Sequence, residues 1–261
     1  MVAAGSLVRP QEVGVLAAVG REAVAVFPGP RVAVLATGDE LVEGAAVPGP
    51  GQIRNSNAPM LAAQVARAGG LPRSLGIARD RLDSLRELVE EGLRTSEVLA
   101  LSGGVSAGKL DLVPEVLREA GVVPHFHKVS MKPGKPLFFG TAERPEGKRY
   151  VFGLPGNPVS SFVCFELFLR PAIRRLAGRT DLDLPRVEAR LADDFDHESD
   201  RTTYHPASLT EKPNGWEVRP VPWLGSADLR AFLAANALLV IPAGPGGCKG
   251  GKWMTVLRLD G

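Results

Sequence analysis

Residues 97–121, EVLALSGGVSAGKLDLVPEVLREAG, contain the pattern from which the fold of this chain can be inferred. Residues 97–102 are an apolar run that predicts a buried strand. Residues 111–121 have helical spacing, with Pro114 in the first turn and Gly121 just beyond the end. The glycine-rich loop between them would bring backbone N–H groups close to a bound anion, so we interpret it as a phosphate cradle.

The same alternation of strand and helix extends to both sides of this stretch. Strand-like runs occur at 31–37, 74–79 and 148–155, and helical patterns at 58–70, 80–94 and 158–178. Strands that alternate with helices are typical of a parallel sheet with helices on both faces. Residues 30–178 are therefore predicted to form an α/β domain with a mostly parallel sheet, in which ligands bind beyond the carboxyl ends of the strands.

The two ends of the chain have different patterns. Residues 1–29 are interpreted as a lead-in, and within it REAVAVFPGP (21–30) alternates like a strand. Residues 184–261 contain short alternating runs separated by proline and glycine. This pattern predicts a small C-terminal all-β domain resembling a barrel.

The composition excludes several classes of function. Of the 261 residues, 44% are hydrophobic and 23% are charged, which is typical of a soluble globular protein. The formal net charge of +2 gives no reason to expect nucleic acid or a membrane surface as a partner. No apolar run approaches the roughly 20 residues of a membrane span, and the N-terminus lacks a signal-peptide pattern. The two cysteines, Cys164 and Cys248, form no disulfide framework, so we expect a cytoplasmic protein.

Four loops follow predicted strands and should therefore meet at one rim of the sheet. They are TGDEL (37–41), ARD (78–80), the glycine-rich loop from residue 102, and GLPGNPVSS (153–161). The last is interpreted as a second anion cradle at the start of a helix, with Asn157 as the cap and Pro158 as the first helical residue.

The same rim is predicted to carry Glu40, Asp80 and Asp111. A site that holds only an anion does not need three carboxylates, whereas Mg²⁺ binds carboxylate and phosphate oxygens together. The stretch MKPGKP (131–136) adds Lys132 and Lys135 in a turn stiffened by two prolines, which suits a compact oxyanion.

Each of these features also has a structural interpretation. Asp80 could cap the following helix, the glycine-rich loop could be a tight turn, and KPGKP could be a surface hairpin. His125 and His127 share a strand face but have no partners at zinc-site spacing. Convergence of four loops on one rim favours a combined binding site.

The motifs TGDEL, IRNSN, SGGVSAG, KPGKP and GLPGNPVS, in this order, resemble the molybdopterin molybdenumtransferases, or molybdenum insertases, among which is the E domain of gephyrin. The resemblance extends from about Gly5 to the C-terminus. It implies an α/β domain that binds adenylylated molybdopterin. It also implies Mg²⁺-dependent insertion of molybdate with release of AMP. A homodimer and a molybdopterin adenylyltransferase partner are further implied.

The resemblance assigns roles to individual residues. Three acids are implied as catalytic and Mg²⁺-binding residues: Glu40, Asp80 and Asp111. The implied molybdopterin-binding residues are Thr37, Gly38, Gly103, Gly104, Ser106, Gly108, Pro155, Gly156, Asn157 and Ser160. The implied molybdate-binding residues are Lys132, Lys135, Ser160, Arg201 and Ser226.

Some positions depart from the family pattern. Asn55 stands where an aspartate is common, Lys109 where the residue is often acidic, and Pro206 where a second arginine is frequent. Members of the family also begin with further domains, of which residues 1–29 would be a remnant. Two alternatives are therefore kept: a molybdopterin adenylyltransferase-like enzyme, and a non-catalytic or partial pterin-binding module.

Overall fold

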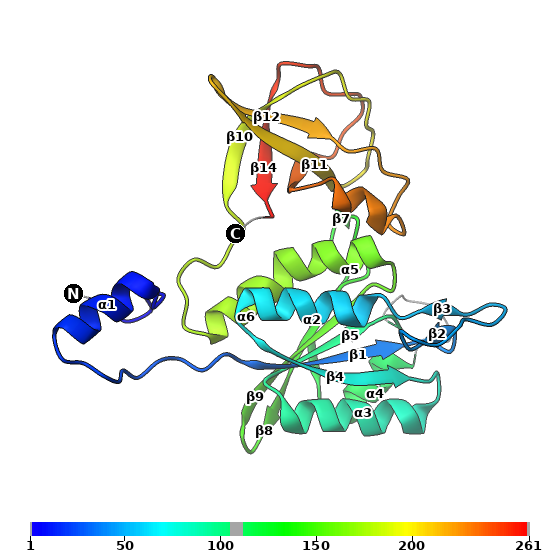
Figure 1. Cartoon of the computed structure of the whole chain (residues 1–261). Helices are drawn as coiled ribbons and strands as arrows, with labels where there is room; N and C mark the ends of the chain where they lie inside the picture. Colours follow the sequence, from blue (N-terminus) through cyan, green and yellow to red (C-terminus); the bar gives the residue numbers. More distant parts are fainter. Residues whose placement is uncertain (1, 105–111, 260–261) are drawn as a thin grey trace.

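The computed structural model describes residues 2–104 and 112–259. They form an α/β body built on a six-stranded sheet and a C-terminal β-barrel that lies over helix α5 (Figure 1). The predicted fold class, a mostly parallel sheet with helices followed by a small barrel, is confirmed. Among the described residues, no helix is both long and apolar enough to cross a bilayer.

The large sheet has the strand order β4-β1-β5-β9-β8-β6. The bounds are β1 Arg31–Thr37, β4 Leu71–Ala78, β5 Val98–Ser102, β6 Val123–His127, β8 Phe138–Arg144 and β9 Gly147–Leu154. Strands β4, β1, β5 and β9 are parallel to one another, whereas β8 is antiparallel to both its neighbours. Only residues 145–146 separate β8 from β9, and a link so short permits an antiparallel hairpin but not a parallel crossover.

Helices cover both faces of this sheet. The bounds are α2 Asn57–Ala68, α3 Leu82–Thr95, α4 Val113–Glu119, α5 Pro158–Cys164 and α6 Arg170–Leu176. Val34 of β1 lies in one core with α2 and α5, and the next residue, Leu35, lies in the other core with α3 and α4. Because successive side chains of a strand point to opposite faces, the apolar run at residues 32–36 of β1 requires helices on both sides.

Two predicted helix boundaries differ from the structure. Helix α3 has Arg81, not Asp80, at its N-cap position, so the cap proposed for Asp80 is wrong. The Asp80 carboxylate instead accepts a hydrogen bond from the backbone N–H of Asp39. The single helix predicted for 158–178 is divided into α5 and α6 by a π-helical turn, η1, at Phe165–Leu169.

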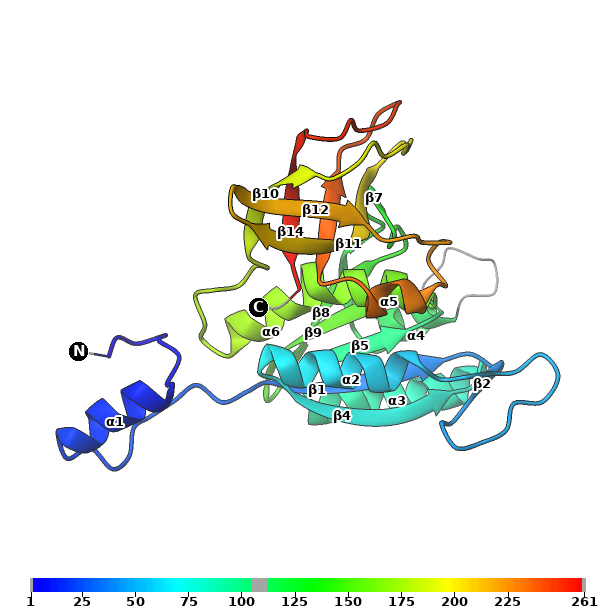
Figure 2. The ribbon, with the colours of Figure 1, turned by 45° about the horizontal axis from the view of Figure 1, so that its top comes forward.

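The barrel closes because the strands at the two ends of its sheet order pair with each other. Its order is β12-β10-β14-β13-β11, and β11 also pairs with β12. The bounds are β10 Arg186–Leu191, β11 Thr202–Lys212, β12 Gly215–Pro220, β13 Ala237–Ile241 and β14 Trp253–Arg258, with a short 3-10 helix, η2, at Leu229–Leu233. Strand β7, Met131–Lys132, comes from the α/β body and pairs with β11 at the side of the barrel (Figure 2). The barrel and the body are thus joined by backbone hydrogen bonds.

The lead-in differs from the prediction. Its helix, α1 (Pro10–Ala18), has no buried residue and lies apart from the body in both views (Figures 1 and 2). The strand expected within residues 21–30 is wrong, because the segment pairs with no strand of the described chain. Its alternating apolar side chains remain exposed, including Val26 and Phe27.

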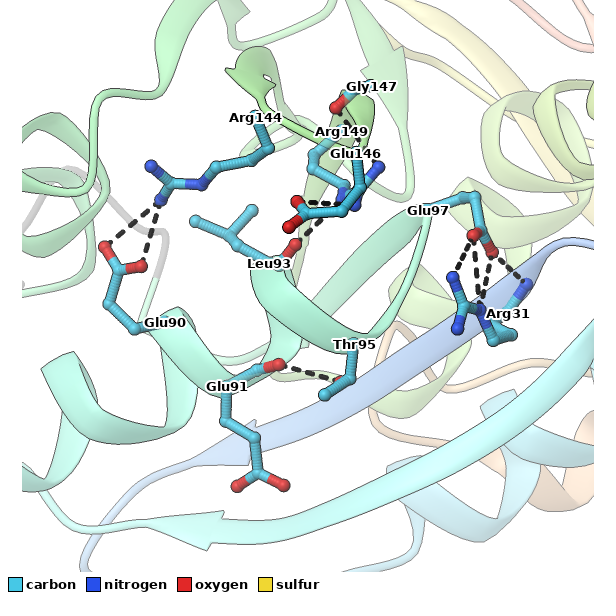
Figure 3. Close-up of polar contacts among 10 residues, drawn as sticks. All are labelled: Arg31, Glu90, Glu91, Leu93, Thr95, Glu97, Arg144, Glu146, Gly147 and Arg149. Atoms are coloured by element: carbon cyan, nitrogen blue, oxygen red, sulfur yellow. Dashed lines mark hydrogen bonds and ion pairs between the residues drawn. The ribbon is translucent and has the colours of Figure 1, made fainter.

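Polar contacts brace the end of the sheet opposite the predicted rim (Figure 3). Buried Arg149 of β9 donates from Nε to the Leu93 carbonyl at 2.8 Å and from Nη1 to the Gly147 carbonyl at 3.1 Å. At the start of β1, the backbone N–H of Arg31 donates to the Glu97 carboxylate at 2.7 Å. A short pair, β2 (Leu41–Val42) with β3 (Ile53–Arg54), lies at the other end, beyond the carboxyl terminus of β1.

Candidate functional site

A cavity of about 1770 Å³ lies between the carboxyl ends of the parallel strands and the barrel. Every predicted site residue within the described part of the chain lines it. These are Thr37, Gly38, Glu40, Asp80, Gly103, Gly104, Lys132, Lys135, Pro155, Gly156, Asn157, Ser160, Arg201 and Ser226. Ser106, Gly108 and Asp111 lie outside the described residues, as does Lys109.

The two acidic loops are bound to each other. The backbone N–H of Asp39 donates to Asp80 Oδ2 at 3.4 Å, and the backbone N–H of Asp80 donates to Asp39 Oδ1 at 3.2 Å. Arg79 Nη1 donates to the carbonyls of Asp39 and Leu41 at 3.1 and 3.2 Å. The Glu40 carboxylate lies against Gly38, where an added Cβ would collide with Glu40 Oε2. These contacts hold the two acidic loops together at the floor of the cavity.

The glycine-rich loop passes close beneath the TGDEL loop. Gly103 has φ +94°, and a Cβ there would lie 2.7 Å from the Thr37 carbonyl oxygen. Only glycine tolerates both the conformation and the approach. Gly156 of the third loop is also near, since its Cβ would lie 3.7 Å from Gly103 Cα. The loops that follow β1, β5 and β9 therefore form one continuous floor.

Asn57, at the start of α2, ties this floor together, and the sequence analysis did not identify it. Its Nδ2 donates to Ser102 Oγ at 2.8 Å and to the Gly156 carbonyl at 2.7 Å. Its Oδ1 is buried and has no hydrogen-bond partner among the described residues. The signal was available in IRNSN, because a polar residue at the start of a helix that faces strand ends is well placed to join their loops.

The KPGKP turn is clamped between α5 and the barrel. Gly134 has φ +109°, and a Cβ there would lie 2.5 Å from Cys164 Sγ of α5. On the other side, Lys132 pairs in register with Thr203 of β11. Neither Lys132 nor Lys135 forms an ion pair within the described part of the chain. Two ammonium groups without ion-pair partners in this part of the chain favour an anion at the cavity wall.

The barrel adds Arg201 and Ser226 to the same wall. Arg201 Nη1 donates to the Met131 carbonyl at 3.2 Å, which places the guanidinium beside the KPGKP turn. Ser226 Oγ accepts from Asn157 Nδ2 at 2.9 Å, and the Ser226 carbonyl accepts from the Val159 N–H at 3.1 Å. Asn157 stands at the N-cap position of α5, as predicted, but its side chain holds the barrel rather than capping the helix.

Aromatic rings from the barrel complete the cavity wall, and the sequence analysis missed them too. They belong to Phe195, His197, His205 and Trp223. Burial, helped by the charges of His197 and Lys132, lowers the pKa of His205 to about 4 against the raising effect of its bond to Pro206. Burial and the Lys132 charge also lower the pKa of His197. Both imidazoles are therefore neutral at pH 7.

The oxygen donors of the floor fit Mg²⁺ in type. Glu40 and Asp80 supply carboxylates, and Thr37 Oγ1 is a buried hydroxyl with no hydrogen-bond partner among the described residues. Such hard oxygen ligands suit Mg²⁺. Within residues 2–104 and 112–259, however, no three acidic, histidine or cysteine side chains gather as a metal site. The third predicted acid, Asp111, lies outside that part.

The structure shows the surroundings of two residues that depart from the family pattern, Asn55 and Pro206. Asn55 is buried, and its Oδ1 accepts from the Ala58 N–H at 3.1 Å, so it satisfies an amide in the first turn of α2. Pro206 is buried within β11 and does not line the cavity.

Comparison with known proteins gives two matches that together cover most of the chain. Residues 33–175 match the family described as "Probable molybdopterin binding domain", and residues 188–259 match the "MoeA C-terminal region (domain IV)". The chain is 34% identical over 256 residues to a protein of Staphylococcus aureus and 35% identical over 261 residues to one of Nostoc sp.. Both are named molybdopterin molybdenumtransferase.

These matches include 98% and 99% of this chain but only 60% of each relative. A crystal structure of a molybdopterin biosynthesis MoeA protein from Pyrococcus horikosii superposes with a TM-score of 0.82 at 30% identity. That match covers 100% of this chain and 62% of the other. The chain thus spans about three fifths of the length of the relatives that it matches.

Proposed function

This chain belongs to the molybdopterin molybdenumtransferase family, and we propose that it takes part in molybdenum cofactor synthesis by inserting molybdate into adenylylated molybdopterin with release of AMP. The observation that carries the proposal is the distribution of charge around one cavity. Carboxylates and glycine loops lie on the floor, and two lysines without ion-pair partners among the described residues lie on the wall.

On this proposal, each wall of the cavity binds a different part of the substrates. The backbone of the loops at Gly103 and Gly156 approaches the phosphates, since no side chain keeps a ligand at a distance there. Lys132 and Lys135, with Arg201 and Ser226, hold the tetrahedral molybdate anion by charge and hydrogen bonds. Ser160, at the start of α5, contributes a hydroxyl between the two groups of ligands.

Glu40 and Asp80, with Asp111, would hold Mg²⁺ through their carboxylates. Bound there, the ion would neutralise phosphate oxygens as negative charge moves toward the leaving AMP. The hydrogen bonds between the Asp39 and Asp80 loops hold the Asp80 carboxylate in place before any ligand enters. Arg79 stabilises the same arrangement by donating to the carbonyls of Asp39 and Leu41.

The match to a MoeA C-terminal region supports the molybdenumtransferase over the adenylyltransferase-like alternative. The partial pterin-binding module remains the second candidate, since Asn55 stands where an aspartate is common in the family. We also propose that a second copy of this chain covers the exposed apolar surface of the lead-in, which includes Val13, Val15 and Phe27. We propose a cytoplasmic location for the same pathway.

The decisive experiment mixes the purified chain with adenylylated molybdopterin, Mg²⁺ and molybdate and follows AMP. Molybdate-dependent AMP release is the expected result. Glu40→Gln should lower the rate at least about tenfold, because it removes a carboxylate from the phosphate side without changing its shape. Binding without release would support the partial module instead. No binding of the adenylylated substrate would refute the proposed function.

A further inference from the structure

Four aromatic rings form a continuous wall on the barrel side of the cavity. We call Phe195, His197, His205 and Trp223 the aromatic wall. Phe195 and His197 are stacked, with centroids 5.9 Å apart and planes 8° apart. His205 meets Phe195 edge-on at 5.0 Å and Trp223 edge-on at 5.2 Å. All four residues line the cavity.

One hydrogen bond of the wall fixes which ring nitrogen of His205 remains as an acceptor. His205 Nδ1 lies 2.8 Å from the Pro206 carbonyl, which can only accept, so Nδ1 carries the proton and Nε2 is the acceptor of the neutral ring. His197 Nε2 lies 2.9 Å from Thr203 Oγ1, which is also near the Arg201 carbonyl. A hydroxyl both donates and accepts, so this contact fixes the position of the His197 ring and not its tautomer.

Trp223 supplies an unsatisfied donor. Its Nε1 is buried and has no hydrogen-bond partner in the described part of the chain. A buried indole N–H is usually paired, because leaving it unpaired costs free energy. The wall therefore combines flat apolar rings with a buried indole N–H that has no partner among the described residues and with an acceptor nitrogen on His205. A planar heterocycle that carries both carbonyl and N–H groups fits this chemistry.

The wall adjoins the residues proposed to hold molybdate. Lys132 of β7 pairs with Thr203 of β11, and His205 lies two residues further along the same strand, on the same side of it. Arg201, two residues before Thr203, contacts the KPGKP turn. The carboxylates and glycine loops lie on the other side of the cavity, on the α/β body.

We propose that the aromatic wall binds the pterin ring of adenylylated molybdopterin. The inference rests on the proposed function and on the covalent order of that substrate. The dithiolene sulfurs that receive the metal are attached to the pterin ring system, and the adenylate lies at the far end, beyond the phosphates. A substrate with its dithiolene at Lys132 and its phosphates over the glycine loops must place its pterin beside the lysines, where the wall stands.

The test measures the affinity of the full chain for 6-hydroxymethylpterin and for AMP by equilibrium dialysis, in the wild type and three variants. Trp223→Leu removes the ring and the donor, and Trp223→Phe removes only the donor. Trp253→Leu is the matched control, since Trp253 is a half-exposed tryptophan of the same barrel that does not line the cavity. Trp223→Leu should weaken pterin binding about tenfold, the usual effect of losing one stacking partner, and Trp223→Phe by less. AMP binding should not change in any variant.

The outcomes separate this inference from the proposed function. If Trp223→Leu weakens AMP and not the pterin, the wall binds adenine and the inference is wrong. If neither affinity changes, while wild-type protein still releases AMP in the presence of molybdate, the inference fails alone. If wild-type protein binds neither the pterin nor AMP, the proposed function fails and the inference with it. Circular dichroism identifies an unfolded Trp223→Leu, in which case Trp223→Phe decides by the same criteria.

Discussion

Replacement of Asn57 by alanine should lower both the stability of the protein and the affinity of the cavity floor for its ligand. The side chain is 9% exposed and donates two hydrogen bonds, to Ser102 Oγ at 2.8 Å and to the Gly156 carbonyl at 2.7 Å. Each such bond contributes about 1 kcal/mol net, and the buried Ser102 hydroxyl left behind adds to the cost. Asn57→Ala should therefore lower the free energy of unfolding by about 2–3 kcal/mol.

The same change should weaken ligand binding beyond its effect on stability. Without the amide, the loop that follows β5 and the loop that follows β9 lose the side chain that joins them. Ordering them again on a ligand would cost conformational entropy of about 1 kcal/mol or more. The dissociation constant for AMP in the presence of Mg²⁺ should rise about fivefold or more, measured by calorimetry.

Gln64→Ala is the matched control for this prediction. Gln64 lies two turns further along α2, and its amide also donates two hydrogen bonds, to the Glu166 carboxylate at 2.8 Å and the Phe162 carbonyl at 3.3 Å. It does not line the cavity. Urea unfolding should show a loss of stability of the same order in both variants, with AMP affinity reduced only in Asn57→Ala. Equal effects on AMP affinity would refute the argument that Asn57 joins the loops.

Three further predictions concern other parts of the molecule. Lys135→Gln should raise the KM for molybdate about tenfold with little change in stability, because it removes an unpaired ammonium from the cavity wall; an unchanged KM in the AMP-release assay would exclude Lys135 from the molybdate site. Between pH 6.5 and pH 5 the unfolded chain protonates His205 while the folded chain, with a pKa of about 4, does not, so stability should fall as pH falls, by about 2 kcal/mol. His205→Leu should remove that part of the slope in urea titrations, and an identical slope would contradict the assignment. Arg149→Met should lower the free energy of unfolding by about 2–3 kcal/mol, since one buried and one partly buried hydrogen bond are lost, yet leave AMP binding unchanged at the opposite end of the sheet.

The floor of the cavity could be predicted from sequence because its placement follows from topology. Once β1, β4, β5 and β9 are parallel, the loops after them must meet at one edge, whatever their side chains do. Glu40, Gly103 and Gly156 line the cavity for this reason. The strand predicted for residues 21–30 is wrong for a related reason: a local alternation of apolar residues does not supply a neighbouring strand. Its period is correct for a strand, but a strand also needs a partner.

The barrel side of the cavity could not be predicted, because no local pattern specifies it. Phe195, His197, His205 and Trp223 come from three separate segments, and their rings meet only after the barrel closes. The position of the barrel depends in turn on the pairing of β7 with β11, across about seventy residues of sequence. Pairings of such long range depend on the whole fold rather than on adjacent residues.

The pairing of β7 with β11 also couples the two halves of the proposed site. Lys132 lies in β7 and belongs by sequence to the α/β body, yet its backbone is a member of the barrel sheet. Arg201 reaches back from the barrel to the Met131 carbonyl, and Ser226 reaches back to Asn157 and Val159 at the start of α5. Lys132 and the aromatic wall therefore belong to the barrel side of the cavity, which Ser226 ties to α5, whereas the carboxylates lie on loops of the large sheet. On the proposed function, the dithiolene and the molybdate anion must meet, and this arrangement places both sets of proposed binding residues on the same side of the cavity. The division of the cavity between two sheets would then follow the division of the proposed substrate between its pterin end and its adenylate end.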